Sequence, residues 1–154
     1  MIGKHLEEVI VSDERLKVLF LCTGNACRSQ MSEGWARHLK ADRIEAYSAG
    51  VAPHGVDLNA VKVMAEVGVD ISDHESKHVD ELKHVKLDYI VSVCDNARES
   101  CPVPPPGTKH VHRGFDDPPA LTRSMLDDEH RLEVYREVRD AIRDYVMTLP
   151  EALE

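Results

Sequence analysis

Residues 16–30 read LKVLFLCTGNACRSQ, and this stretch joins an apolar run to a turn that is rich in chemically active residues. It opens with a short apolar run, of the kind that is buried on both faces of a parallel sheet. A helix is expected next, over residues 28–40, because Met31, Trp35 and Leu39 recur on one helical face. Between the strand and the helix lies a turn that contains two cysteines, a glycine and an arginine.

Strands and helices alternate along the rest of the sequence. The expected strands are 16–22, 43–50, 87–94 and 109–114, and the expected helices are 28–40, 57–68, 78–85 and 127–148. Segments 101–107 and 115–124 are expected to be loops, because they are rich in proline and turn residues. This alternation predicts an α/β fold with a parallel sheet and right-handed crossovers. Residues 1–14 are interpreted as an N-terminal extension of a single domain over 15–154.

The composition excludes several classes of function. The formal net charge of −9 does not attract nucleic acid or anionic lipid, so an anion site must be strongly positive locally. No apolar run approaches the roughly 18 residues that span a bilayer, and the N-terminus lacks the apolar core of a signal peptide. We therefore expect a cytoplasmic protein with no nucleic-acid or membrane partner. Its four cysteines are then catalytic, metal-binding or simply buried, rather than a disulfide framework.

The turn CTGNACRS, residues 22–29, has the composition of an oxyanion site. Backbone N–H groups at a helix N-terminus, together with the helix dipole, favour an anion. Gly24 and Asn25 tolerate positive φ, which a tight anion-binding turn requires, and Arg28 adds a forked, permanently charged donor. The predicted substrate-binding residues are Thr23, Gly24, Asn25, Ala26, Cys27, Arg28 and Ser29.

Cys22 is the predicted nucleophile of this loop. The field that binds the anion also favours the thiolate form of Cys22, and Ser29 is placed to donate a hydrogen bond to its sulfur. The alternative is that Cys22 is a small buried residue and Arg28 a solvated one. The spacing C-x5-R occurs by chance, but the strand before it and the Gly-Asn pair, serine and helix that accompany it favour the site.

A strand followed directly by a C-x5-R-S loop resembles the low-molecular-weight tyrosine phosphatase superfamily, over nearly all of the chain from Leu16 onward. The resemblance implies a four-stranded parallel sheet in the order 2-1-3-4, flanked by helices on both faces. It also implies a general acid, an aspartate that directly precedes a proline. In FDDPP the matching residue is Asp117. Without the loop, Asp116 and Asp117 would be interpreted as turn residues.

Two further cysteines distinguish this chain from the phosphatases. Cys94 ends the third expected strand, and because neighbouring parallel strands end at the same sheet edge, it can lie near Cys22. Cys101 follows in a short polar segment beside a proline run. The segments CTGNACRSQMSEGW, YSAG, CDNARESCP and GFDDP together resemble the thioredoxin-coupled arsenate reductases. The phosphatases usually continue the Asp-Pro pair with tyrosines, whereas here no aromatic residue lies between Phe115 and Tyr135.

This resemblance implies reduction of arsenate to arsenite, for arsenic detoxification, by a relay of three cysteines. Cys22 attacks arsenate while Asp117 protonates the leaving oxygen. Cys94 then forms a transient Cys22–Cys94 disulfide as arsenite leaves, and Cys101 converts it into a Cys94–Cys101 disulfide. Reduced thioredoxin recycles that disulfide, and no tightly bound cofactor is expected. Cys27 has no redox role in this scheme and is expected to be a packed residue.

Two alternatives stay open on the sequence alone. One is a phosphatase that hydrolyses phosphate monoesters, for which Cys94 and Cys101 are dispensable; the reductase is also expected to show weak activity of this kind. The other is a non-catalytic thiol sensor or oxyanion-binding protein. No metal site is expected, because none of the nine histidines adjoins a cysteine or carboxylate at ligand spacing. We also expect a monomer.

One position departs from the family pattern. Some members bind a potassium ion beside the loop through Asn, Glu, Ser and Asp side chains. Asn25, Glu33 and Ser48 match the first three, but Lys77 occupies the fourth position. We hypothesise that the Lys77 amine replaces the ion and supports the loop through Asn25 or Glu33. The alternative is a solvated surface lysine.

Overall fold

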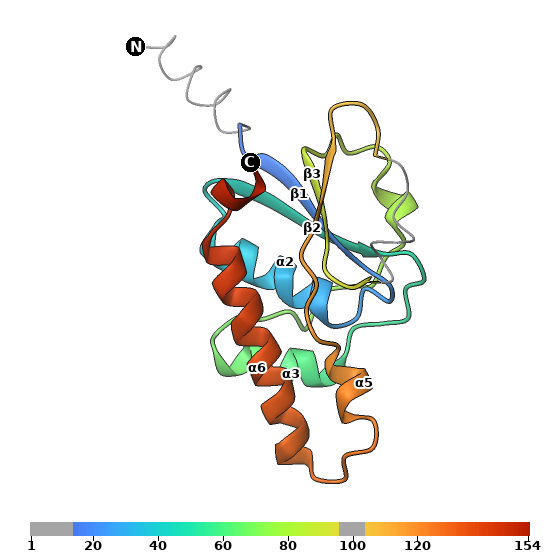
Figure 1. The fold of residues 1–154 in the computed structure, drawn as a ribbon, viewed down its shortest axis with the longest axis vertical. Helices are drawn as coiled ribbons and strands as arrows, with labels where there is room; N and C mark the ends of the chain where they lie inside the picture. Colours follow the sequence, from blue (N-terminus) through green and yellow to red (C-terminus); the bar gives the residue numbers. More distant parts are fainter. Residues whose placement is uncertain (1–13, 96–103) are drawn as a thin grey trace.

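A four-stranded parallel sheet organises the fold in the computed structural model, which describes residues 14–95 and 104–154 (Figure 1). The strands are β1 (Leu16–Cys22), β2 (Ile44–Gly50), β3 (Tyr89–Ser92) and β4 (Lys109–His112). The helices are α2 (Arg28–Leu39), α3 (Leu58–Glu66), α5 (Pro118–Thr122) and α6 (Asp128–Met147), with the 3₁₀ turns η1 (Val79–Leu82) and η2 (Glu151–Leu153). The strand order is β2-β1-β3-β4 with every pairing parallel, which confirms the predicted order 2-1-3-4.

The central strand β1 carries the core and ends at the site. Residues 18–21 of this strand have no exposed surface, as expected for a strand buried on both faces. At its end, Cys22 lies opposite Gly50 of β2. On its other side, the N–H of Val93 donates to the carbonyl of Leu21, at 2.9 Å. Cys22 and Cys94 therefore leave the sheet at the same edge, as the sequence predicts.

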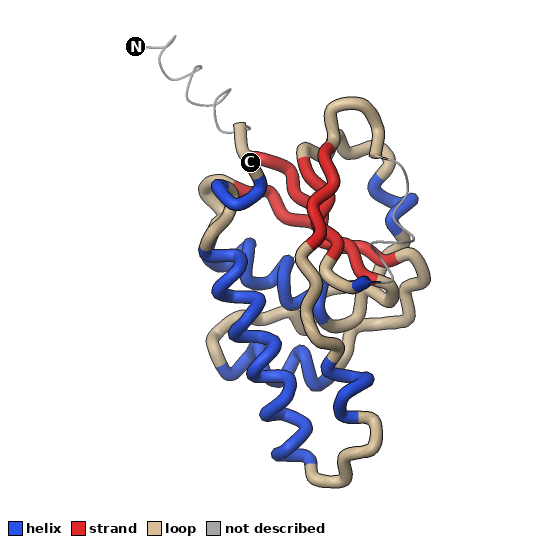
Figure 2. The backbone as a smooth tube through the Cα atoms, viewed as in Figure 1, coloured by secondary structure: helices blue, strands red, loops and turns tan. Residues whose placement is uncertain are grey.

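One face of the sheet is covered by α2, with α3 and α6 packed behind it, while η1 lies across the strands from α2 (Figures 1 and 2). The predicted apolar face of α2 is confirmed at Met31 and Trp35, which are buried against the core. The indole N–H of Trp35 donates to the carbonyl of Arg139 in α6, at 3.0 Å. This contact joins the helix that follows the loop to the longest helix of the fold.

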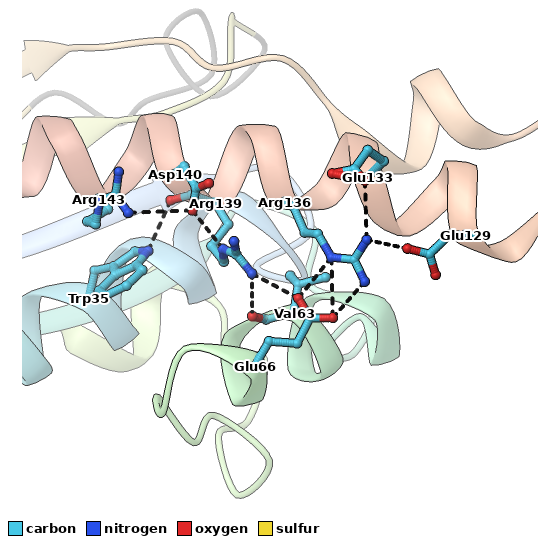
Figure 3. A network of polar contacts seen from close by, with 9 residues as sticks. All are labelled: Trp35, Val63, Glu66, Glu129, Glu133, Arg136, Arg139, Asp140 and Arg143. Atoms are coloured by element: carbon cyan, nitrogen blue, oxygen red, sulfur yellow. Dashed lines mark hydrogen bonds and ion pairs between the residues drawn. The ribbon is translucent and has the colours of Figure 1, made fainter.

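Ion pairs fix α6 on α3 (Figure 3). Glu66 of α3 accepts from Arg136 at 2.8 Å and from Arg139 at 2.9 Å, and Arg139 also donates to the carbonyl of Val63. The hydrogen bond from Arg136 is the main cause that lowers the pKa of Glu66. Such partly exposed pairs contribute at most about 1 kcal/mol each, so their main effect is to set the register of the two helices.

The structure corrects the expected bounds of several elements. Segment 115–124, predicted to be a loop, contains the helix α5, because a proline in the first helical turn loses no hydrogen bond and Asp117 stands at the N-cap. The helix expected over 78–85 is only the 3₁₀ turn η1. The strands expected over 87–94 and 109–114 are confined to β3 and β4. Among the described residues, no helix is long and apolar enough to cross a membrane.

Candidate active site

The loop between β1 and α2 is held by the segment that follows β2. Four loop carbonyls accept backbone N–H groups from that segment: Cys22 from Val51 at 3.3 Å, Thr23 from Ala52 at 2.8 Å, Gly24 from His54 at 3.1 Å, and Ala26 from Asp57 at 2.9 Å. In a trans peptide the N–H points opposite to the carbonyl oxygen. The N–H groups that follow these carbonyls therefore point away from the segment, toward the inside of the loop. We expect an anion placed there to meet several of these backbone donors.

Asn25 sets the shape of this loop. It adopts the left-handed conformation, with φ of 47°, and its side chain is completely buried. Its Oδ1 accepts from the backbone N–H of Lys77 at 2.9 Å, which fixes the orientation of the amide. Its Nδ2 therefore donates to Ser29 Oγ, at 2.9 Å. Gln30 Nε2 adds a donor to Oδ1 at 3.1 Å.

Ser29 connects Asn25 to the predicted nucleophile, Cys22. Its Oγ lies 3.0 Å from Cys22 Sγ. When Cys22 is a thiolate its sulfur can only accept, so the Ser29 hydroxyl donates to it. A donor in this place stabilises the negative sulfur of a thiolate. The predicted hydrogen bond between Ser29 and Cys22 is thus present, and the hydrogen bond from Asn25 holds Ser29 Oγ in place beside the sulfur.

Gly24 is needed for a different reason from the one predicted. Only Asn25 of the predicted Gly24–Asn25 pair adopts positive φ. A Cβ at Gly24 would lie 2.1 Å from Nε2 of His54, so the glycine makes room for the imidazole to cross the loop. His54 belongs to the APHG stretch after β2, which the sequence marks only as a loop.

Arg28 and Asp117 face each other beside the loop. Arg28 begins α2 and its Nη2 lies 3.5 Å from Asp117 Oδ2, while its Nη1 donates to the carbonyl of Phe115 at 3.0 Å. The Asp117 side chain is 42% exposed and caps no N–H of α5. Its carboxylate is therefore available to the site, on the same side as the guanidinium.

A cavity of about 530 Å³ brings the predicted residues together. It is lined by the loop, by Cys94 and Asp95 at the end of β3, by Asp117, Pro119 and Arg123 around α5, and by His54. The second predicted thiol, Cys94, is buried, with its Sγ 3.4 Å from Thr23 Oγ1 at the loop. Cys101 lies outside the described residues, as do the other residues of 96–103 and residues 1–13 of the expected N-terminal extension.

Two cationic or ionisable side chains of the cavity are not predicted from the sequence. Arg123 follows the last residue of α5, in a segment predicted to be a loop, and brings a second guanidinium to the cavity. His54 reaches it only through its packing over Gly24. No phenylalanine, tyrosine or tryptophan of the described residues lines the cavity. A small oxyanion therefore finds positive charge here, but an aryl group finds no aromatic ring to stack on.

Cys27 differs chemically from Cys22, although it belongs to the same loop. It is buried, and burial raises the pKa of the Cys27 thiol well above its usual value, with a further contribution from nearby Asp57. Asp57 itself is bonded to Tyr135 at 2.6 Å and caps α3. Cys27 is thus protonated at neutral pH, and it is packed, as the sequence predicts.

The four residues that match the family's potassium-site positions are joined by hydrogen bonds, but among the described residues the Lys77 amine contacts only backbone carbonyls. Ser48 Oγ donates to Glu33 Oε1 at 2.5 Å, and Lys77 Nζ donates to the carbonyls of Ser48 at 3.1 Å and Glu75 at 3.2 Å. The expectation that the amine contacts Asn25 or Glu33 is wrong, because the backbone N–H of Lys77, not its amine, holds Asn25. Within residues 14–95 and 104–154 no cluster of three or more potential ligands could hold a metal ion.

Known proteins are similar to this chain in sequence and in fold. The family model for the low molecular weight phosphotyrosine protein phosphatase matches residues 17–154. A protein of Halalkalibacterium halodurans named arsenate reductase is 44% identical over 134 residues, which cover 87% of this chain and 94% of that protein. An arsenate reductase solved in its reduced state has a TM-score of 0.66 and 30% identity, over 90% of this chain and 99% of its own. A low molecular weight protein tyrosine phosphatase from T. tengcongensis has a TM-score of 0.69 and 27% identity, and the match covers 89% of this chain and 99% of that protein.

Proposed function

The chain belongs to the low molecular weight phosphotyrosine protein phosphatase family, and we propose that it uses the anion loop of that family to reduce arsenate to arsenite. The observation that carries this function is a second thiol, Cys94, which lines the same cavity as Cys22. Hydrolysis of a phosphate ester needs only one thiol, whereas reduction of arsenic needs two electrons, which two thiols supply as they form a disulfide. A relative with 44% identity that is named arsenate reductase supports this choice.

In the first step arsenate binds to the backbone N–H groups of the loop and to Arg28. Arg28 lies 3.5 Å from Asp117, so the arginine and the acid reach the same anion. The Cys22 thiolate attacks arsenic of the monohydrogen arsenate ion, and the bond from arsenic to the hydroxyl oxygen breaks. Asp117 gives its proton to that oxygen, which leaves as water. Arsenic is still pentavalent at this point.

In the second step the Cys94 thiolate attacks the sulfur of Cys22. The sulfur–arsenic bond breaks and its electron pair stays on arsenic, which becomes trivalent and leaves as arsenite. The two thiols are oxidised to a Cys22–Cys94 disulfide. Thr23 Oγ1, 3.4 Å from Cys94 Sγ, ties the attacking thiol to the loop that carries its target.

In the third step the Cys101 thiolate attacks Cys94 and releases Cys22 as a thiolate. The resulting Cys94–Cys101 disulfide is reduced by the dithiol of thioredoxin, which is oxidised in turn. We propose that this cycle runs in the cytoplasm, where thioredoxin keeps thiols reduced. Because Cys101 lies outside the described residues, this step rests on the resemblance of CDNARESCP, residues 94–102, to the thioredoxin-coupled arsenate reductases.

Phosphatase activity is the second candidate, favoured by the loop and acid that both reactions use. The cavity offers no phenylalanine, tyrosine or tryptophan from the described residues to an aryl substrate, so we propose that this activity is weak. The two functions separate at the cysteines. Replacing Cys94 or Cys101 abolishes arsenate turnover but leaves hydrolysis of p-nitrophenyl phosphate in place.

The test is arsenate-dependent oxidation of NADPH in the presence of thioredoxin and thioredoxin reductase. Wild type is expected to turn over many equivalents of arsenate, and Cys101→Ser to stall after about one. If neither protein consumes NADPH while both hydrolyse p-nitrophenyl phosphate equally, the chain is a phosphatase.

A further inference from the structure

A chain of hydrogen bonds beside Cys94 has no role in the proposed mechanism. Ser92 of β3 and His112 of β4 are opposite each other in the sheet, and their Oγ and Nδ1 atoms lie 2.8 Å apart. Ser92 Oγ also lies 2.8 Å from Nε2 of His110. On its other side, His112 Nε2 lies 3.1 Å from Oδ1 of Asp95, the residue that directly follows Cys94. The hydrogen bonds therefore run from Ser92 in β3 through His112 in β4 to the carboxylate of Asp95, which lines the cavity.

The carboxylate determines the direction of these bonds. Asp95 can only accept, so His112 Nε2 carries a hydrogen and donates it. In neutral His112 the Nδ1 atom then accepts from the Ser92 hydroxyl. The order Asp–His–Ser has the composition of a hydrolase triad, but Ser92 has no exposed surface and cannot reach a substrate. The buried serine therefore holds His112 in place, and His112 in turn holds Asp95.

The two carboxylates that line the cavity are each held by a donor. Asp117 pairs with Arg28, and Asp95 pairs with His112. The Asp95 side chain is 91% exposed, and His112 is its sole hydrogen-bond partner within the described part of the chain. Gly114 leaves space for this contact, since a Cβ there would lie 3.2 Å from His112 Nε2 and 3.3 Å from Asp95 Oδ1.

On the basis of the proposed function, we propose that His112 is a positioning residue that ties the Asp95 carboxylate to β4. An untied carboxylate at this place would bring negative charge toward the oxyanion and toward the Cys94 thiolate, in a chain whose net charge is already −9. Like charges repel even where solvent partly screens them, so a carboxylate that lines the same cavity would weaken both the binding of the anion and the attack by Cys94. His112 prevents this without touching either group.

The test is a double-mutant cycle on His112→Ala and Asp95→Asn, read out as the affinity for inorganic phosphate by calorimetry. Phosphate is a suitable probe because thiols do not reduce it. His112→Ala is expected to raise the dissociation constant about three- to tenfold, the size expected for one partly screened charge at the rim. Asp95→Asn is expected to bind phosphate at least as tightly as wild type. The double variant is expected to return to within about twofold of wild type, because the charge that His112 restrained is gone.

Two further variants test the assignment independently. In Gly114→Ala the added methyl group crowds both His112 Nε2 and Asp95 Oδ1. This variant is expected to weaken phosphate binding, as His112→Ala does. Adding Asp95→Asn to it is expected to restore the affinity. His130→Ala is the matched control, because it removes a similar contact, His130 to Asp127 at 3.0 Å, on an exposed part of α6. It is expected to leave phosphate affinity unchanged. In the Cys101→Ser background, stopped-flow formation of the Cys22–Cys94 disulfide is expected to slow with His112→Ala and to recover with Asp95→Asn.

Wild-type phosphate affinity in His112→Ala, or a loss that Asp95→Asn does not restore, would overturn the positioning role. The second result would make His112 a structural residue of the β3–β4 contact. A protein that binds phosphate and shows the rescue, yet reduces no arsenate, would refute the proposed function and leave the role of His112 standing.

Discussion

Substitution of Asn25 is the sharpest structural perturbation of the anion loop. Asn25→Ala removes a buried side chain that donates to Ser29 and accepts from Gln30 and from the backbone N–H of Lys77. At about 1 kcal/mol for each net hydrogen bond, these three contacts contribute about 3 kcal/mol. Alanine must also adopt φ of 47°, which costs about 1–2 kcal/mol for a residue with a Cβ. We therefore expect the free energy of unfolding to fall by about 4 kcal/mol.

Asn25→Gly separates the two contributions. Glycine loses the same hydrogen bonds but adopts positive φ without strain, at the cost of about 0.4–1 kcal/mol from its more flexible unfolded chain. The glycine variant is therefore expected to be about 0.5–1 kcal/mol more stable than the alanine variant. Urea unfolding followed by circular dichroism measures both. The matched control is Glu137, an exposed residue within α6. There the order is expected to reverse, with Glu137→Ala more stable than Glu137→Gly by about 1 kcal/mol.

Two results would refute this reasoning about Asn25. If alanine is as stable as glycine at this position, Asn25 is not held in the left-handed conformation. If Asn25→Ala costs less than about 1 kcal/mol, the three hydrogen bonds do not hold the loop.

Three further predictions concern the same cavity. Asp117→Asn is expected to lower kcat for arsenate about 10²- to 10³-fold with an unchanged Tm, because the leaving oxygen loses its proton donor; a loss below about threefold in the coupled assay would remove Asp117 from this role. Gly24→Ala is expected to abolish measurable phosphate binding by calorimetry, because its Cβ would lie 2.1 Å from His54 Nε2, and His54→Ala should restore it in the double variant. Failure of that rescue would mean that Gly24 serves the backbone and not the imidazole. Because burial raises the pKa of Cys27 above 9.0, the folded protein keeps a proton that the unfolded chain releases, so stability should fall as pH rises through about 9. Cys27→Ala should flatten this decline in urea unfolding between about pH 8 and pH 10, and an unchanged decline would contradict the pKa shift.

The strand, loop and helix around Cys22 could be predicted because their signals are local. The buried run of β1, the Gly-Asn pair and the apolar face of α2 all lie within residues 16–40. The hydrogen bond between Ser29 and Cys22 follows from the same stretch. The helix α5 could not be predicted in this way, since it has only five residues and shows no helical period, and an Asp-Pro pair begins turns as well as helices.

Other parts of the site depend on contacts between distant residues. His54 is thirty residues from Gly24 in the sequence and meets it only in the fold. The Lys77 amine was expected near side chains, but two backbone carbonyls bind it, and the sequence carries no signal for a carbonyl's direction. The contact of Asp95 with His112 likewise requires the pairing of β3 with β4.

The measurement that tests the central claim most directly is a single turnover without thioredoxin. Reduced protein is mixed with one equivalent of arsenate, and the arsenite formed and the disulfide present are identified by mass spectrometry. Wild type is predicted to give one arsenite per protein and a Cys94–Cys101 disulfide, and Cys101→Ser one arsenite and a Cys22–Cys94 disulfide. Arsenite without either disulfide, or a disulfide that includes Cys27, would contradict the proposed relay.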